Sequence, residues 1–431
     1  MICDNIKVNS SGILEFAGQS TVELAKKYST PLYLLDEVQL RKNCRTYYNA
    51  MKEAYGENFA VLYASKANSF KRIYEIVNEE NMHVDVVSSG EIFTALKAGY
   101  PIKKAYFHSN NKTDEDVDFA IKNGIGYFVV DNAEELDVID AVANKYGIIQ
   151  NILLRLTPGI DTHTYEAVNT GKVDSKFGTA IETGQAKQIV AKTLNFKNIK
   201  LCGFHCHIGS MVFDSDTFLR GAEIMLAFMA EMKKEYGFIT EQLDLGGGYG
   251  VRYLDTDETI DIAANIKEVA EFLKSKTAEL GLSMPKVLLE PGRSIVADAG
   301  MTLYTVGTVK KITGYKNYIS VDGGMTDNPR YALYESPYTL YIANKADKEA
   351  TLKSDVVGRC CESGDIIQPD VMLPEAERGD ILAVCTTGAY NYSMASNYNR
   401  IARPPIVMLN GKESYLAVRR ETLEDLLNCD L

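Results

Sequence analysis

Short apolar runs alternate with helix-like segments eight times between residues 60 and 290. These runs lack a polar face, which is typical of parallel strands buried on both sides. We therefore expect a TIM-type (β/α)₈ barrel. A doubly wound open sheet is the alternative, but eight strands over roughly 230 residues favour the barrel. The expected strands are Ala60–Ser65, Val84–Ser88, Ala105–His108, Tyr127–Asp131, Ile152–Thr157, Leu201–Ile208, Gln242–Leu245 and Val287–Glu290, with helices at Gly90–Ala98, Asp114–Asn123, Ala133–Lys145, Phe218–Tyr236 and Ile260–Leu280.

The pattern changes on both sides of this region, and 431 residues exceed what one ordinary core needs. After about Gly300, alternating runs separated by turn residues predict a C-terminal antiparallel β-sandwich or barrel-like domain. Near the start we expect a helix at Thr21–Tyr28, a strand at Leu32–Leu35 and a helix capped by Asp36. We expect residues 36–300 to form the barrel, and 1–35 with 301–431 to form the β domain. The expected C-terminal strands are Thr302–Val309, Tyr318–Val321, Tyr338–Ile342, Thr351–Val357, Ile381–Val384 and Ile406–Leu409.

Composition and charge restrict the classes of function. A net charge of −12 argues against binding nucleic acid or anionic lipid through the overall field, and leaves open a local cationic pocket. No apolar run approaches the roughly 18 to 20 residues of a membrane span, and the N-terminus lacks a secretory pattern. Eight cysteines without a CxxC pair, with Cys360 and Cys361 adjacent, predict reduced thiols in a cytoplasmic protein.

The segment Cys202–His207 contains two cysteines and two histidines, which raises the question of a metal site. Alternation along a strand would place Cys202 and Cys206 on one face and the two histidines on the other. A closed zinc site needs four converging ligands. We therefore expect no metal there.

Polar residues gather where the predicted strands end, and the loops at those ends build the active site of such a barrel. The first strand delivers Lys66, whose amine, partly desolvated by apolar surroundings, would have a lowered pKa and act as a nucleophile. A lysine that simply extends to water is the alternative. A polar loop, Pro158–Thr183, is expected over one mouth of the barrel. The other strand-end groups are Ser88–Glu91, His108–Asn111, Asp131, Arg155, His207–Ser210, Gly246–Gly248 and Glu290–Arg293.

The glycine run Gly246–Gly248 would let backbone N–H groups approach a phosphate, although a tight turn explains it equally well. Ser210 and Arg293 would add a hydroxyl and a fixed cation. A phosphate site beside a reactive lysine fits pyridoxal phosphate (PLP), with Glu290 as partner of the ring nitrogen and His207 against the ring face. An ion pair of Glu290 with Arg293 is the alternative.

The predicted β domain carries further reactive side chains. Cys361–Asp365 is a turn that places a thiol beside a carboxylate, although a loop cysteine is more often inert than catalytic. Arg330 and Tyr334 stand four residues apart and would share one face of a helix. Gly388–Tyr390 follows an apolar strand.

Eight motifs together resemble the diaminopimelate decarboxylases, which belong to the fold type III, alanine-racemase-like PLP-dependent decarboxylases. One departure lies at Tyr398–Pro404, where the family usually has Tyr-Asn-Ser-Arg-Pro-Arg-Pro and this chain has Tyr-Asn-Arg-Ile-Ala-Arg-Pro. We assign no role to the first arginine of that motif. The matching motifs, in the family's order, are Tyr63–Asn68, Asp85–Glu91, Ser175–Gly178, His205–Ser210, Gly246–Gly248, Glu290–Arg293, Cys361–Asp365 and Gly388–Tyr390.

The resemblance implies decarboxylation of meso-2,6-diaminopimelate to L-lysine and CO2, the last step of lysine biosynthesis, by a PLP-bound homodimer with shared active sites. It implies Lys66 as the Schiff-base lysine, and Cys361 and Glu362 as residues supplied by the partner subunit, with Cys361 as the catalytic acid. The implied cofactor-binding residues are Lys66, His207, Ser210, Gly246, Gly247, Gly248, Glu290, Pro291, Gly292, Arg293 and Tyr390. The implied substrate-binding residues are Arg293, Arg330, Tyr334, Glu362 and Tyr390.

Other activities share these features. A decarboxylase of ornithine, lysine, arginine or carboxynorspermidine is the nearest alternative, but two arginines, Arg293 and Arg330, suit a second substrate carboxylate. A racemase shares the barrel and the lysine, whereas the Cys361–Glu362 turn favours the decarboxylase. An inactive binding homologue should lack Lys66, the acid or the phosphate cup, and the sequence has all three. We expect the loop Pro158–Thr183 to close over the substrate.

Overall fold

The computed structural model describes residues 1–160 and 175–431. Contacts divide the chain into two compact units. The barrel unit comprises Cys44–Gly250 and Thr259–Gly292, and the β unit comprises Met1–Asn43, Val251–Glu258 and Arg293–Leu431. No helix in the described residues is long and apolar enough to span a membrane.

The described residues of the barrel unit form a closed barrel of eight parallel strands. The barrel closes because β13 pairs with β5 and β8 pairs with β9, both in parallel. The predicted barrel is confirmed, and the open sheet is excluded. The strands are β5 (Phe59–Ala64), β6 (His83–Val86), β7 (Ala105–Phe107), β8 (Tyr127–Val130), β9 (Gln150–Thr157), β11 (Ile199–His205), β12 (Gln242–Asp244) and β13 (Lys286–Leu289).

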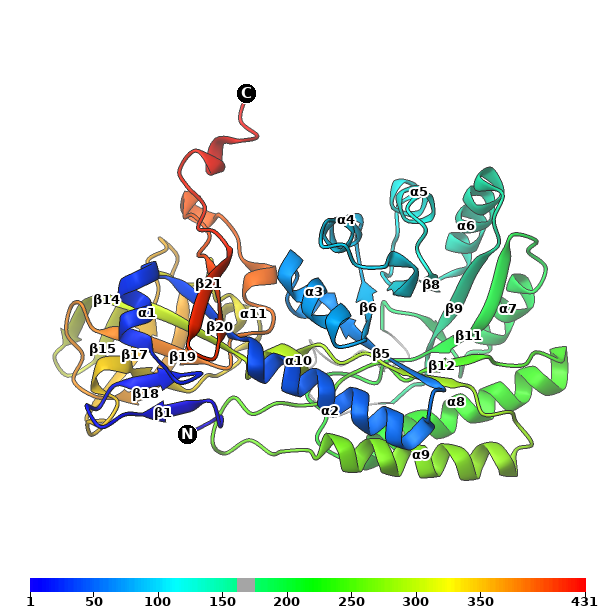
Figure 1. Cartoon of the computed structure of the whole chain (residues 1–431), viewed down its shortest axis with the longest axis horizontal. Helices are drawn as coiled ribbons and strands as arrows, with labels where there is room; N and C mark the ends of the chain where they lie inside the picture. The colour runs from blue at the N-terminus through cyan, green and yellow to red at the C-terminus, as the bar shows by residue number, and fades with distance from the viewer. Residues whose placement is uncertain (161–174) are drawn as a thin grey trace. The chain divides into compact units, whose positions relative to one another are not determined.

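Helices follow the strands and pack outside them, as Figure 1 shows for α8 beside α9. Side chains fill the interior of the barrel, where Leu62, Tyr106 and Leu153 are fully buried in one cluster. The ring of Tyr106 stacks on Tyr127, with 4.3 Å between the centroids. The barrel is therefore a packed core, and only its ends are available for a site. The helices are α3 (Lys71–Glu79), α4 (Ser89–Lys97), α5 (Asp114–Lys122), α6 (Ala133–Tyr146), α7 (Gln185–Thr193), α8 (Ser215–Tyr236) and α9 (Ile262–Glu279).

The loop predicted over Pro158–Thr183 lies partly outside the described residues, which omit 161–174 and with them His163, Thr170 and Gly171. Its described end contains a two-residue strand, β10 (Thr179–Ala180), which pairs in parallel with β9. Two residues carry no periodicity, so the sequence did not indicate this strand.

The β unit, all of which is described, is built on a nine-stranded sheet. Most neighbours are antiparallel, as predicted, but β15 and β17 pair in parallel, as do β4 and β20. The long strand β14 pairs with β4 and β19 through its first half and with β15 through its second. The strands are β4 (Leu32–Asp36), β14 (Gly300–Ile312), β15 (Lys316–Val321), β16 (Leu340–Ile342), β17 (Leu352–Val357), β18 (Ile366–Leu373), β19 (Ile381–Cys385), β20 (Ile406–Asn410) and β21 (Glu413–Val418).

Two of these strands, β18 and β21, were missed by the sequence pattern. Pro369 and Asp370 interrupt β18, and Asp370 has φ of +51°, so the alternation of buried and exposed residues breaks. In β21 no residue is buried, because it is the edge strand beside β20. Neither strand shows the apolar alternation by which strands are recognised.

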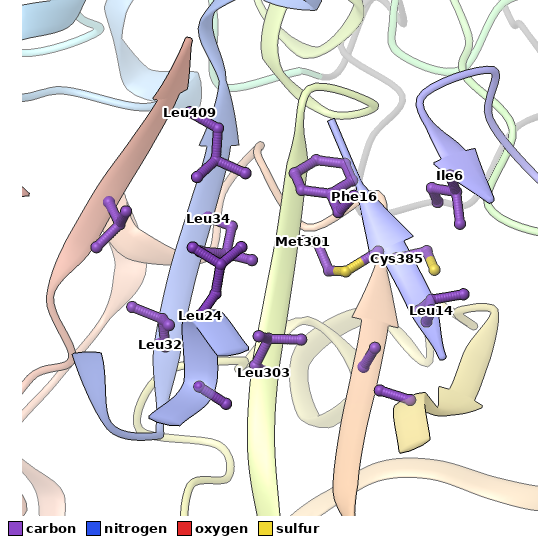
Figure 2. Close-up of a cluster of buried hydrophobic side chains, with 14 of the residues drawn as sticks. Ile6, Leu14, Phe16, Leu24, Leu32, Leu34, Met301, Leu303, Cys385 and Leu409 are labelled. Carbon is purple, nitrogen blue, oxygen red and sulfur yellow. The ribbon is translucent and has the colours of Figure 1, made fainter. Parts of the chain in front are cut away.

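The first 36 residues pack on this sheet. They form β1 (Ile6–Val8), β2 (Leu14–Phe16), β3 (Gln19–Ser20) and α1 (Thr21–Tyr28), and then enter the sheet as β4. Asp36 caps α2 (Glu37–Tyr55), because its Oδ1 accepts the N–H groups of Val38 and Gln39 at 3.0 and 3.1 Å. Figure 2 shows the apolar cluster that joins the segment to the sheet, which includes Phe16, Leu24, Leu34, Met301, Leu303 and Cys385.

Candidate active site

Lys66 lies directly after the carboxyl end of β5, in a 3₁₀ turn at Ser65–Ala67. Its neighbours Ser65 and Ala67 are fully buried, whereas Lys66 itself is exposed. The turn is held by the hydroxyl of Tyr63, which donates to the carbonyl of Asn68 at 2.8 Å. Burial raises the pKa of Glu91 to about 7, and the nearby charge of Lys66 opposes that rise. A fixed turn therefore presents the amine at the active-site end of the barrel.

A buried carboxylate, Glu290, stands between two imidazoles at the same end of the barrel. Nε2 of His108 lies 2.7 Å from Oε1 of Glu290, and Nε2 of His205 lies 3.1 Å from Oε2. Burial lowers the pKa of His205 to about 4, so its ring is neutral and donates through Nε2–H. Burial alone would raise the pKa of Glu290, but the two imidazoles hold it below its ordinary value. Glu290 is therefore an anion inside the barrel.

Asp244, at the end of β12, differs from Glu290. Burial and the charge of Glu290 raise its pKa well above the ordinary value, which favours the neutral form of Asp244. Its Oδ1 accepts the N–H of Gly246 at 2.8 Å. Two neighbouring carboxyl groups with pKa values shifted in opposite directions are typical of catalytic sites, since burial and neighbouring charges shift pKa values there.

The spacing of His108, His205 and Glu290 also raises the question of a metal ion, because one potential ligand atom from each lies within 4.8 Å of the others. Tetrahedral ligands about 2.0 Å from zinc stand about 3.3 Å apart. The contacts of 2.7 and 3.1 Å are shorter and match direct hydrogen-bonded or ionic contact. The three groups therefore contact one another directly in this structure.

The glycine run Gly246–Gly248 is required by close packing of strand ends. A Cβ on Gly247 would lie 2.2 Å from the carbonyl oxygen of Glu290, and one on Gly248, where φ is +114°, 2.5 Å from that of Gly209. The segment that contains Ser210 is joined to this run, because the N–H of Val212 donates to the carbonyl of Gly248 at 2.9 Å. The segment that follows Ser210 thus lies beside the glycine run.

His207 lies beside the glycine run, and its Nδ1 accepts the N–H of Gly247 at 3.3 Å. Burial, together with the charges of Lys66 and Arg155, lowers the pKa of His207 well below its ordinary value. Its ring is therefore a neutral, flat surface near the charge of Lys66.

In the β unit, two buried arginines share a group of tyrosines. The guanidinium of Arg293 donates to the hydroxyl of Tyr253 at 2.8 Å and lies 4.8 Å above the ring of Tyr390. Arg330 donates to the hydroxyl of Tyr338 at 2.9 Å and lies 4.6 Å above the ring of Tyr253. The structure thus brings together three of the predicted residues, Arg293, Arg330 and Tyr390, around Tyr253.

Cys361 and Glu362 lie on an exposed turn of the β unit. The turn is fixed from below by buried Asp365, which accepts the N–H groups of Cys360 and Met325 at 2.7 and 2.6 Å. The N–H of Cys361 donates to Asn399 at 2.8 Å, within the segment that departs from the family pattern. The thiol of Cys361 and the carboxylate of Glu362 are therefore exposed at the surface of the β unit.

Tyr334, at the end of α11 (Arg330–Tyr334), is half-buried.

Sequence reasoning missed the roles of four side chains: His108, His205, Asp244 and Tyr253. The first three stand at strand ends, and that position was the available signal. His108 had been placed there without a partner, because the sequence cannot show which strand ends face one another. Tyr253 lies in an irregular loop and gave no signal.

The barrel sequence matches a known family. Residues 39–297 match the pyridoxal binding domain of the pyridoxal-dependent decarboxylases. The fold and the strand-end residues therefore define a PLP-dependent decarboxylase.

The nearer relatives narrow the class. The chain is 44% identical to diaminopimelate decarboxylase of Bacillus methanolicus, over 96% of either chain, and 42% identical to that of Bacillus subtilis, over 98% of this chain and 96% of the relative. The crystal structure of diaminopimelate decarboxylase from M. jannaschii in complex with L-lysine superposes with a TM-score of 0.89 at 33% identity, over 99% of this chain and 98% of that one. The chain belongs to the diaminopimelate decarboxylase family.

Proposed function

We propose that the protein decarboxylates meso-2,6-diaminopimelate to L-lysine and CO2, the last step of lysine biosynthesis. The observation that carries this is the identity of 42 to 44% to diaminopimelate decarboxylases over nearly the whole chain. The cofactor is pyridoxal 5'-phosphate, which when bound takes up the electron pair left by departing CO2.

The barrel residues fit that cofactor. We propose that Lys66 anchors it, that His207 lies against its ring and that Glu290 holds the proton of its ring nitrogen. The burial of Glu290 and its lowered pKa support this, because they keep an anionic carboxylate inside the barrel. We assign the glycine run to the phosphate because glycines let a backbone approach an anion closely. The proposed phosphate residues are Ser210, Gly246, Gly247, Gly248, Pro291, Gly292, Arg293 and Tyr390.

The β unit would recognise the rest of the substrate. Arg293 and Arg330 would bind the carboxylate that is retained, assisted by Tyr334 and Tyr390, and Glu362 would bind the distal ammonium. The Sγ of Cys361 would return a proton to the carbon that loses CO2. Separate groups of the site would bind the two carboxylates and the two ammonium groups of diaminopimelate. A diamine with one carboxylate should therefore be a poor substrate.

We further propose a cytoplasmic homodimer with shared active sites, in which residues 36–300 carry the cofactor and 1–35 with 301–431 supply residues across the dimer interface. The exposure of Cys361 and Glu362 supports this, since side chains that act in a partner's site must reach the surface.

Mixing two inactive variants tests the shared site. Lys66→Ala and Cys361→Ala should each be inactive alone. Subunit exchange between them should restore up to about a quarter of the wild-type activity, because mixed dimers contain one intact site. If subunit exchange is demonstrated and activity does not recover, then Lys66 and Cys361 of the same subunit act in one site.

The function itself is tested by lysine formation from meso-diaminopimelate, with and without PLP. Lysine and ornithine serve as competing substrates, and turnover of either in preference to diaminopimelate would overturn the proposal. Loss of optical activity of L-lysine or L-ornithine without CO2 release would indicate a racemase instead. Failure to bind PLP would indicate an inactive binding homologue.

A further inference from the structure

Tyr253 lies in the loop Val251–Glu258, which is held firmly within the β unit. Oδ2 of Asp257 accepts the N–H groups of Tyr253 and Leu254 at 2.8 and 2.9 Å. The hydroxyl of Thr339 donates to the carbonyl of Tyr253 at 2.8 Å. The side chain is only 4% exposed, and its ring packs edge-on against Tyr338 at 5.5 Å. A fixed loop therefore gives this phenol one position.

That position lies between two cations. The hydroxyl oxygen of Tyr253 accepts from Arg293, and its ring face lies under the guanidinium of Arg330. Burial alone would raise the pKa of this phenol, but the two arginines together hold it below its ordinary value. The same side chain thus restrains both guanidiniums by two different kinds of contact, a hydrogen bond and a cation–π contact.

Arg330 is 4% exposed, and within the described residues it pairs with no acidic side chain. Its hydrogen-bond partners are two hydroxyls, those of Tyr338 at 2.9 Å and Ser336 at 3.2 Å. A buried guanidinium without a carboxylate is unfavourable unless a ligand supplies the negative charge. The phenol-lined pair of arginines is therefore suited to receive an anion.

We propose that Tyr253 is a specificity-determining positioning residue, which aligns Arg293 and Arg330 as one receptor for the carboxylate that the substrate retains. This inference rests on the proposed function. The hydroxyl of Tyr253 fixes the direction of the Arg293 guanidinium, and its ring fixes the plane of Arg330. Without that restraint, two like charges would separate and would no longer meet one carboxylate together.

Tyr253→Phe tests the proposal, because it keeps the ring and the backbone contacts and removes only the hydroxyl. Tyr249→Phe is the matched control, since Tyr249 is equally buried and its hydroxyl contacts Asn265 rather than an arginine. In the PLP-loaded enzyme we expect Tyr253→Phe to raise KM for meso-diaminopimelate about 10-fold, since a hydrogen bond to a charged group is lost. We expect kcat to change by less than about 3-fold.

Equilibrium binding separates positioning from a structural role. L-lysine and cadaverine differ only in the carboxylate, so we expect the Kd of L-lysine to rise about 10-fold in Tyr253→Phe, while that of cadaverine stays unchanged. The ratio of the two constants does not depend on the fraction of folded protein. An unchanged ratio, or an equal shift in Tyr249→Phe, would overturn the inference. A wild-type enzyme that fails to decarboxylate diaminopimelate would instead overturn the proposed function.

Discussion

The two units of the protein bury opposite charges by different means. In the barrel unit, an anionic carboxylate, Glu290, is compensated by the imidazoles of His108 and His205. In the β unit, two guanidiniums are compensated by phenols, as Arg330 is by Tyr253 and Tyr338. The charges of imidazoles and carboxyls depend on protonation, which burial and neighbouring charges shift, whereas guanidiniums stay protonated throughout the range in which proteins fold. The barrel unit therefore has a charge set by protonation, and the β unit has a permanent one.

The difference corresponds to two tasks in decarboxylation. Chemistry on the cofactor needs groups that hold or release a proton at the right step. Burial provides such groups by shifting their pKa values. Recognition of a carboxylate needs a cation that is charged under all conditions, which arginine provides in a fixed planar form.

Removal of the lysine should have the largest effect. Lys66→Ala should lower kcat by at least about 10³-fold, as the loss of a covalent catalytic group does. Absorbance spectra of the variant with added PLP should lack the band of a lysine-bound cofactor. Lys71→Ala, an exposed lysine at the start of α3, is the control and should behave as wild type. A persisting band in Lys66→Ala would show that another amine anchors the cofactor.

Removing the negative charge of Glu290 in the barrel unit should have the next largest effect. Glu290→Gln keeps the shape but removes the charge, and kcat should fall about 10²-fold, as expected for a lost electrostatic contact in a dry site. Asp244→Asn should change kcat by less than about 3-fold, because the raised pKa of Asp244 favours its neutral form and an amide oxygen can accept the N–H of Gly246. Steady-state kinetics of the two variants test this, and equal losses of kcat would contradict the opposite directions of the two pKa shifts.

The sequence predicted much of the candidate site in the barrel unit and less of it in the β unit. Lys66, His207 and Glu290 follow strands whose apolar runs are unmistakable, so their strand-end positions were predictable. The pairing of Glu290 with His205 was not, because it depends on which strands face one another across the barrel. Tyr253 was missed because an irregular loop has no periodicity, and only tertiary packing places it beside two arginines.

On the β side, Arg330→Lys should change recognition more than catalysis. Lysine keeps the charge but loses the planar fork and the stacking on Tyr253. KM for meso-diaminopimelate should rise about 30-fold, with the Kd of cadaverine unchanged, since the lost contacts concern only the carboxylate. Because the charge is permanent, the effect should be the same from pH 6 to pH 9. A pH-dependent loss would show that a titrating group shares this task.

The smallest effect should appear in stability rather than activity. His83 of β6 contacts the carbonyl of Lys104 through Nδ1 at 3.0 Å, away from any carboxylate partner among the described residues. Burial, followed by the charges of Lys286 and Lys104, lowers the pKa of His83 to about 4. Between pH 6.5 and 4 the unfolded chain binds a proton at this site that the folded barrel does not, so stability falls as pH falls through that window.

His83→Gln should remove this dependence, because glutamine can donate the same hydrogen bond without titrating. From pH 7 to pH 5 the wild-type barrel should lose about 2 kcal/mol from this site, which is 1.36 kcal/mol for each of roughly 1.5 pH units. Hydrogen exchange at the backbone amides of Val84 and Val86 in β6 measures this loss of stability within the barrel unit. If the free energy of unfolding depended on pH equally in both proteins, His83 would titrate normally. Burial alone would then not keep the imidazoles of this barrel neutral.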